Sequence, residues 1–292
     1  MRPDAFFIPS ETGAGSQRLY LHYPAQGNAL HGLVLYIHPL AEELNKSRRM
    51  AALQARALAQ AGYAVLQIDL LGCGDSAGDF GDATWQHWVS DVVQGCKWLR
   101  QHEAVSLVGR NPAPLWLWGL RAGCLLAVEA SQQLDEACHF MLWQAPALGK
   151  TLLQQFLRLK VAGNMLSGNA SSAMADMRRH LANGSPQEIA GYQLSPELAS
   201  GLAQADLTPP ACKSPTQRLE WFEVSSHEDG ELSPASVATL AQWRQAGFMI
   251  RSHVVYGSAF WQTSEIEVVP ALIEASTSAV SALDPSPILE AA

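Results

Sequence analysis

The ten residues from Leu115 to Cys124, LWLWGLRAGC, constrain the fold of this chain more than any other segment. A short apolar run typical of a buried strand leads directly into a segment of helical period. Gly119 and Gly123 stand on either side of the junction. Small residues there allow a tight strand-to-helix turn whose central side chain projects above the sheet. The spacing therefore predicts a strained turn with Arg121 at its tip.

Short apolar runs alternate with longer helical segments along the rest of the chain. This alternation predicts a mostly parallel sheet with helices on both faces. Eight strands are expected, at residues 6–8, 18–23, 33–38, 64–70, 115–119, 140–144, 219–225 and 248–255. Helices are expected at residues 47–61, 83–101, 122–133, 234–246 and 264–276, with Gly62 and Gly247 positioned to end the first and fourth. Because no helix separates the first two strands, we expect them to pair as an antiparallel ribbon.

The interval from residue 149 to 215 interrupts this rhythm, since it holds helical patterns and turn clusters but no convincing strand. We interpret it as a helical cap inserted into a single α/β domain. The core then comprises an N-terminal part, residues 1–148, and a C-terminal part, residues 216–276. The small, polar and Pro-containing residues 277–292 predict a flexible tail.

Composition excludes several classes of partner. The 19 basic and 27 acidic residues give a net charge of −8, which disfavours binding to nucleic acid. The longest apolar stretch, Leu115 to Ala130, is shorter than the ~20 residues that a membrane span needs. The N-terminus lacks a signal-peptide pattern, and the five cysteines form no CxxC pair, so we expect a cytoplasmic protein with no disulfide or metal site. No cofactor signature is present, and a homo-oligomer is compatible with the sequence.

The segment from Asp69 to Gly78, DLLGCGDSAG, loosely matches a dinucleotide-binding fingerprint. That fingerprint requires a helix to begin inside the motif, whereas here the helical pattern starts near Thr84. We therefore expect no bound dinucleotide. Ser76 is expected to cap backbone groups of the turn rather than to act as a nucleophile.

These features together resemble the α/β-hydrolase superfamily over residues 15 to 276. The resemblance rests on the strand order, the His38-Pro39 loop, the turn after Asp69, the Gly119–Gly123 elbow and the cap insertion. More narrowly, AEELNKSRRM at 41–50, WGLRAG at 118–123 and FWQT at 260–263 are similar to the exosortase A system-associated hydrolase 2 group. That similarity implies a bacterial protein associated with exopolysaccharide synthesis and with the sorting of proteins that carry a PEP-CTERM signal. The proteins of this exosortase and exopolysaccharide system are candidate partners. It implies no defined reaction.

The superfamily resemblance also implies roles for particular positions. The backbone amides of Leu40 and Ala122 correspond to the donors of an oxyanion hole. The nucleophile position holds Arg121, which stays protonated and cannot attack a carbonyl. Asp229 or Glu231 stands where the catalytic acid is expected.

The loop after the last predicted strand, residues 256–263, contains no histidine. His253 lies inside the strand pattern, where a packed histidine is expected rather than a base. The catalytic triad therefore lacks two of its three members.

Two functional hypotheses follow. In the first, the protein binds a carboxylate, phosphate or acyl ligand through Arg121 at a helix N-terminus. The pocket would be completed by Leu40, Asn45, Lys46, Ala122, Phe260 and Trp261. An ion pair of Arg121 with Glu42 or Glu43 is the competing arrangement, and it would plug the pocket. A pocket filled in this way and by the two aromatic residues would leave a role in protein interaction.

In the second hypothesis, the protein is an active hydrolase of an ester, thioester or acyl-sugar with a non-standard catalytic set. A polar loop of Glu42, Glu43, Asn45 and Lys46 would position water, and Arg121 would stabilise an oxyanion. The basic pair Arg48-Arg49 that follows has an alternative interpretation without function, in which it lies on the exposed face of a helix capped by Ser47. The missing triad favours binding over catalysis.

Overall fold

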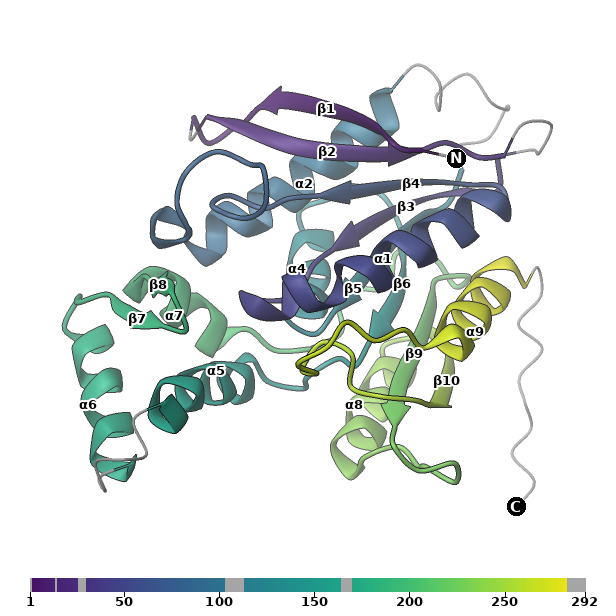
Figure 1. The fold of residues 1–292 in the computed structure, drawn as a ribbon. Helices are drawn as coiled ribbons and strands as arrows, with labels where there is room; N and C mark the ends of the chain where they lie inside the picture. Colours follow the sequence, from purple (N-terminus) through teal and green to yellow (C-terminus); the bar gives the residue numbers. More distant parts are fainter. Residues whose placement is uncertain (1, 14, 26–29, 103–112, 164–169, 283–292) are drawn as a thin grey trace.

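The computed structural model of the chain describes residues 2–13, 15–25, 30–102, 113–163 and 170–282. Within these residues, eight strands form one sheet in the order β1-β2-β4-β3-β5-β6-β9-β10 (Figure 1). The strands are β1 Asp4–Pro9, β2 Ser16–His22, β3 Gly32–Ile37, β4 Tyr63–Ile68, β5 Leu115–Leu120, β6 Cys138–Trp143, β9 Arg218–Ser225 and β10 Met249–Tyr256. Strand β2 pairs antiparallel with both β1 and β4, and the pairs from β4 to β10 are parallel. The predicted α/β-hydrolase sheet and its antiparallel ribbon are confirmed.

Helices cover both faces of the sheet (Figure 1). Helices α1 (Glu42–Gln60) and α9 (Pro270–Ser281) pack on one face, and α2 (Trp85–Gln101), α4 (Ala122–Ser131) and α8 (Pro234–Gln245) pack on the other. Side chains along each strand alternate between the two faces of the sheet. In β3, Leu33 and Leu35 pack against the face covered by α2, α4 and α8, and Val34 and Tyr36 pack against the face covered by α1 and α9. All four are buried, which is why this strand reads as a continuous apolar run.

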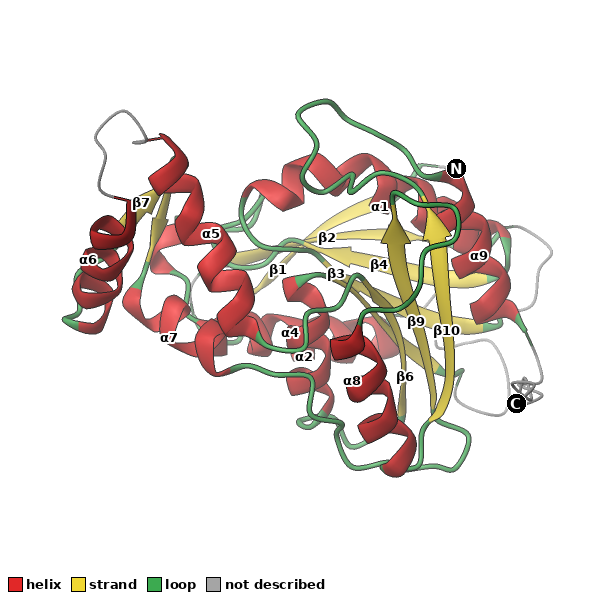
Figure 2. Cartoon of the chain, turned by 90° about the horizontal axis from the view of Figure 1, so that it is seen from below, coloured by secondary structure: helices red, strands yellow, loops and turns green. Residues whose placement is uncertain are grey.

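The insertion forms a separate lobe beside the sheet (Figure 2). It contains α5 (Gly149–Gly163), α6 (Ala170–Ala182), β7 (Gln187–Ile189), β8 (Tyr192–Leu194) and α7 (Pro196–Gln204). Its ends are joined by backbone hydrogen bonds from Gly149 N–H to Ala205 O, 2.8 Å, and from Leu207 N–H to Ala147 O, 3.2 Å.

Strands β7 and β8 form a hairpin, so the expectation that the insertion has no strand is wrong. The two-residue turn at Ala190 and Gly191, with φ of 50° and 86°, has the left-handed backbone that tight hairpins need. Strands of three residues are too short to show an alternating pattern in the sequence.

Two helices differ from their predicted bounds. Helix α1 begins at Glu42 rather than at residue 47, and Ser47 is not its cap: its hydroxyl donates to Glu43 O at 2.7 Å, inside the helix. Helix α9 starts at Pro270, which is favoured in a first helical turn, and it runs to Ser281. The first five residues of the predicted flexible tail are therefore helical, while residues 283–292 of that tail lie outside the described residues. Gly62 and Gly247 do follow the ends of α1 and α8, with φ of 94° and 96°.

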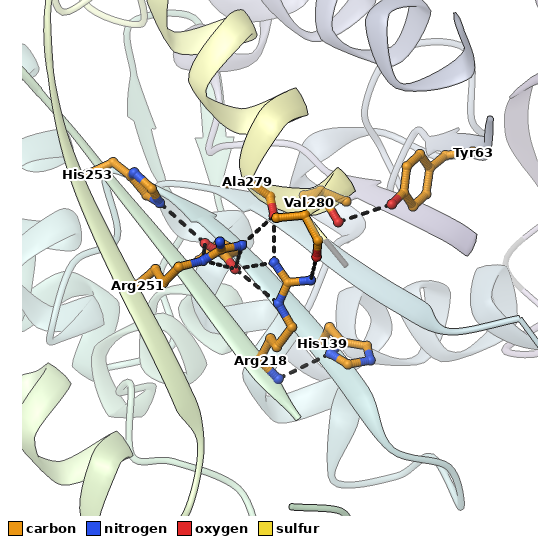
Figure 3. A network of polar contacts seen from close by, with 9 residues as sticks. Tyr63, His139, Arg218, Arg251, His253, Ala279 and Val280 are labelled. Carbon is orange, nitrogen blue, oxygen red and sulfur yellow. Dashed lines mark hydrogen bonds and ion pairs between the residues drawn. The ribbon is translucent and has the colours of Figure 1, made fainter. Parts of the chain in front are cut away.

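A buried cluster of charges fastens α9 to the sheet (Figure 3). Glu220, only 1% exposed, accepts hydrogen bonds from Arg218 at 2.6 Å and Arg251 at 2.8 Å. Both guanidinium groups also donate to carbonyl oxygens at the end of α9, including that of Ala279. Burial raises the pKa of Glu220, but hydrogen bonds from His253, Arg251 and Arg218 together hold it below its usual value.

His253 completes the cluster with a contact of 3.3 Å to Glu220 and stacks on Phe222. It is a packed strand histidine, as expected.

No helix within the described residues combines the length and apolar character needed to cross a membrane.

Candidate functional site

Arg121 occupies the tip of the turn between β5 and α4. Its backbone has φ 55° and ψ −115°, a conformation that is unfavourable for any residue with a side chain. The turn is held by the Arg121 N–H, which donates to Trp143 O on β6 at 3.0 Å. A Cβ at Gly119 would lie 2.5 Å from Cys124 N, and one at Gly123 would lie 2.1 Å from Ile37 O. Both glycines are therefore required, because the first turn of α4 lies against its own strand and against the end of β3.

The guanidinium group of Arg121 is held on three sides. Its Nε donates to Glu43 Oε1 at 3.3 Å, and its Nη2 donates to Gln155 Oε1 at 2.6 Å. Its central carbon, Cζ, lies 5.8 Å from the centre of the Trp261 ring. Glu43 belongs to α1, Gln155 to the cap and Trp261 to the loop after β10, so one buried cation joins three separate parts of the chain. Nη1 has no hydrogen-bond partner among the described residues.

A cavity of about 290 Å³ lies between the sheet and the cap. Arg121 is not one of its lining residues and borders it through its partners Glu43 and Gln155, and Ala122 and Trp261 also lie outside the lining. The cavity wall combines four apolar side chains with carboxylates, an amine and amides. The lining residues are Leu40, Glu42, Glu43, Lys46, Leu152, Gln155, Phe156, Leu159 and Gln262. Its size is at the lower end of the roughly 300–1,000 Å³ that is usual for small-molecule sites.

Two carboxyl groups of the cavity wall have perturbed acidity. Burial raises the pKa of Glu42, against the weaker effect of Lys46. Burial also raises the pKa of Glu43, and the neighbouring Arg121 opposes this only in part. One oxygen of Glu42, Oε2, is buried and has no hydrogen-bond partner within the described part of the chain. Such groups in a cleft are typical of functional sites.

The other residues predicted from the polar segment lie on the first turns of α1, not in a loop. Lys46 lines the cavity, and its Nζ donates to Gln262 O at 3.3 Å. Asn45 points elsewhere, because its Nδ2 donates to the Tyr192 hydroxyl of the cap at 3.1 Å.

The two predicted oxyanion donors lie at the same edge of the sheet. Leu40 lines the cavity and Ala122 is the first residue of α4. Neither amide N–H has a backbone acceptor among the residues that the structure describes. The close packing of Gly123 on the Ile37 carbonyl brings the start of α4 against the chain that leads to Leu40.

The loops after β9 and β10, where the resemblance places a catalytic acid and a histidine, do not bring such groups to the cavity within the described residues. Asp229 is exposed in the loop after β9 and does not line the cavity. Phe260 is fully buried against Trp143 and also lies outside the cavity lining. Trp261 is 3% exposed and packs on Phe260 and Arg121. Two aromatic rings thus fill the space beside the elbow.

Gln155 and Gln262 contribute to the site without having been predicted as site residues. Gln155 interrupts an otherwise apolar face of α5, between Leu152 and Phe156, and that interruption was the available indication. Ser76 caps the turn after β4 as expected: its hydroxyl donates to Asp69 O at 2.6 Å and accepts from the Arg18 N–H at 2.8 Å.

Comparison with known families decides the classification. Residues 28–205 match the family described as Serine aminopeptidase, S33 (Hydrolase_4). The chain belongs to this family. The S33 match covers the elbow, α1 and most of the insertion, so it includes every cavity-lining residue except Gln262. No curated protein matches the sequence at a significant level.

Solved structures agree with the S33 family fold. Est1E from Butyrivibrio proteoclasticus with ferulic acid bound has a TM-score of 0.65 at 16% identity, over 95% of this chain and 96% of that one. A thermostable carboxyl esterase from Bacillus coagulans, in complex with glycerol, has a TM-score of 0.63 at 14% identity, over 96% and 97%. A serine hydrolase without a lid from Xanthomonas campestris has a TM-score of 0.56 at 15% identity, over 96% and 94%. At these identities the likeness concerns the fold alone.

Proposed function

We propose that this S33 family member binds a small anionic ligand, which is a carboxylate, phosphate or acyl compound. On this proposal the protein does not hydrolyse esters. The observation that carries the proposal is Arg121 at the tip of the elbow, where acyl transfer needs a nucleophile. A guanidinium group has no lone pair to attack a carbonyl, but it is a strong donor to carboxylate and phosphate oxygens.

The ion pair with Glu43 is compatible with this proposal. A single contact of 3.3 Å leaves most of the donors of Arg121 unused, and Nη1 has no partner among the described residues. Gln155 is neutral, so a ligand carboxylate beside Lys46 would form the stronger, charge-assisted hydrogen bond in its place. The pair therefore narrows the cavity without filling it, since about 290 Å³ stays open.

A second candidate function is hydrolysis with a non-standard catalytic set. The raised pKa of Glu43, in a cavity beside Arg121, is the observation that favours it, because such a carboxyl can act as a general base. The exposed position of Asp229 and the aromatic side chains of Phe260 and Trp261 argue against it. A water-activating base alone lacks the orienting partners of an acyl-transfer site.

The cellular setting that we propose follows from the sequence resemblance to the exosortase A system-associated group. The protein would act in the cytoplasm, with the proteins of that system as candidate partners. Cell fractionation tests the compartment, and recovery in the membrane or secreted fraction would contradict it.

Calorimetric titration with 4-methylpentanoate and its neutral amide tests the binding proposal. We expect the acid to bind at least about tenfold more tightly than the amide, because a hydrogen bond to a charged group is stronger than one to a neutral group. Arg121→Gln should reduce this preference, because it removes one of the two cations beside the ligand, and Arg49→Gln, on the exposed side of α1, should leave it unchanged. Equal binding of acid and amide to the parent protein would overturn the proposal.

A further inference from the structure

We propose that the ligand of this cavity is a zwitterion, a small α-amino acid with an aliphatic side chain, whose ammonium group contacts Glu42 and Glu43 and whose carboxylate contacts Lys46 and Arg121. The inference rests on the proposed function and specifies the ligand more closely. It derives from the charges of the cavity wall, from an unpartnered oxygen and from the apolar face of α5.

The charges around the cavity balance one another. Glu42 and Glu43 supply two carboxylates to the wall, Lys46 supplies an ammonium group, and the Arg121 guanidinium lies directly behind Glu43. A dianionic phosphate would lie beside two carboxylates, which is unfavourable. A simple amine would leave Lys46 and Nη1 of Arg121 without an anion. A ligand with one charge of each sign complements both halves of the wall.

Glu42 indicates a hydrogen-bond donor on the ligand. Its Oε2 is buried and has no partner among the described residues, although the residue lines the cavity. A buried polar atom without a partner is costly, and a primary ammonium group supplies three donors. Because this oxygen has almost no accessible surface, the Glu42 side chain has to rotate for the oxygen to receive a hydrogen bond from the ligand. A ligand that carries only a carboxylate offers no donor for which it would do so.

The cap supplies the surface for an aliphatic side chain. Leu152, Phe156 and Leu159 follow one another at the spacing of a single helix face, and all three line the cavity. Leu159 is 40% exposed, so its side chain is accessible to a ligand. Leu40 bounds the cavity from the end of β3. The volume of about 290 Å³ suits a compact molecule rather than a long acyl chain.

L-leucine and two compounds that each lack one of its charged groups test the inference on the full-length protein by calorimetric titration. L-leucine carries both charges, 4-methylpentanoate lacks the amine and 3-methylbutylamine lacks the carboxylate. We expect L-leucine to bind at least about tenfold more tightly than either of the other two, since each lacks one charge-assisted contact. Glu42→Gln should weaken L-leucine by about tenfold and leave 4-methylpentanoate within about twofold of the parent.

The outcomes separate this inference from the proposed function. If 4-methylpentanoate binds as tightly as L-leucine, the zwitterion is wrong and the anion site stands. If 3-methylbutylamine binds as tightly as L-leucine and the acid does not bind, or if none of the three binds, both proposals are wrong. Glu274→Gln, on the exposed side of α9, is the matched control for Glu42→Gln. Lys46→Gln provides a second test, since it should weaken L-leucine and 4-methylpentanoate alike.

Discussion

The Nε of Arg121 lies 3.3 Å from Oε1 of Glu43, joining the residue at the elbow tip to the second residue of α1. The two side chains are only 9% and 13% exposed, so the pair is largely removed from water. Breaking a buried pair by removing one partner leaves an uncompensated charge. The arginine and its glutamate therefore have to be understood together, as one neutral element under the cavity.

This element explains how a cation is tolerated where the fold normally presents a small nucleophile. Glu43 supplies the opposite charge, Gln155 supplies a hydrogen bond from the cap, and Trp261 supplies an aromatic face. A guanidinium without these partners would be costly to bury.

The packing of Gly123 predicts a large effect of adding one methyl group. Gly123→Ala would place Cβ 2.1 Å from Ile37 O, and the backbone of both elements would have to move. We expect a loss of about 3 kcal/mol in the free energy of unfolding, measured by urea denaturation. Gly184→Ala, where φ is 82° and no atom lies within 4 Å of the added Cβ, should cost only about 1 kcal/mol for its backbone conformation. Equal effects of the two substitutions would show that this close contact is absent.

Asp91 predicts a pH dependence of stability. Burial raises the pKa of Asp91 to about 7, although the Leu71 N–H donates to its carboxylate at 2.8 Å. Because the folded state holds this proton more tightly than the unfolded chain, stability declines as the pH rises from about 4 to about 7.

Asp91→Asn keeps the acceptor and removes the titration. The variant should gain about 2 to 3 kcal/mol relative to the parent between pH 5 and pH 8, measured by denaturation at each pH. Asp135→Asn, at an exposed position, should show no such change. A difference between Asp91→Asn and the parent that stays constant with pH would contradict the assignment.

The cluster in Figure 3 predicts that α9 depends on one buried carboxylate. Glu220→Gln would leave the guanidinium groups of Arg218 and Arg251 without their acid, and we expect a loss of about 3 kcal/mol in the free energy of unfolding. His253→Gln, at the more exposed edge of the cluster, should cost less than about 1 kcal/mol. Thermal and urea unfolding measure both. A similar cost for the two variants would mean that the carboxylate has no special role.

The sequence predicted the central strands well because β3, β4, β5 and β6 are buried on both faces. The outer strands β1 and β10 are more exposed and were recognised from their short apolar runs. Each of the eight expected runs became a strand with ends shifted by a few residues, and the spacing of Gly119 and Gly123 identified the turn. These features are local, since a buried strand needs a continuous apolar run and a close backbone approach needs glycine.

The cavity was harder to predict because it depends on contacts between distant segments. The start of α1 was not predicted because its first residues are polar and the residue before them, Ala41, is not one that favours a helix N-cap. The role of Gln155 depends on how the cap packs over Arg121, which no local pattern encodes. The choice of Glu43 over Glu42 as the partner of Arg121 required the orientation of α1.

The most direct test of the central claim is hydrolysis of short-chain p-nitrophenyl esters and thioesters by the purified protein, beside Arg121→Ser and Arg121→Ala. Labelling with a fluorophosphonate probe accompanies the assay. We expect all three proteins to be inert and unlabelled. The parent protein and Arg121→Ala carry no hydroxyl at the elbow, and the serine of Arg121→Ser would have no histidine among the described residues that line the cavity to activate it. Turnover by the parent protein that is lost in Arg121→Ala would contradict this expectation, and would assign Arg121 and Glu43 to a catalytic set.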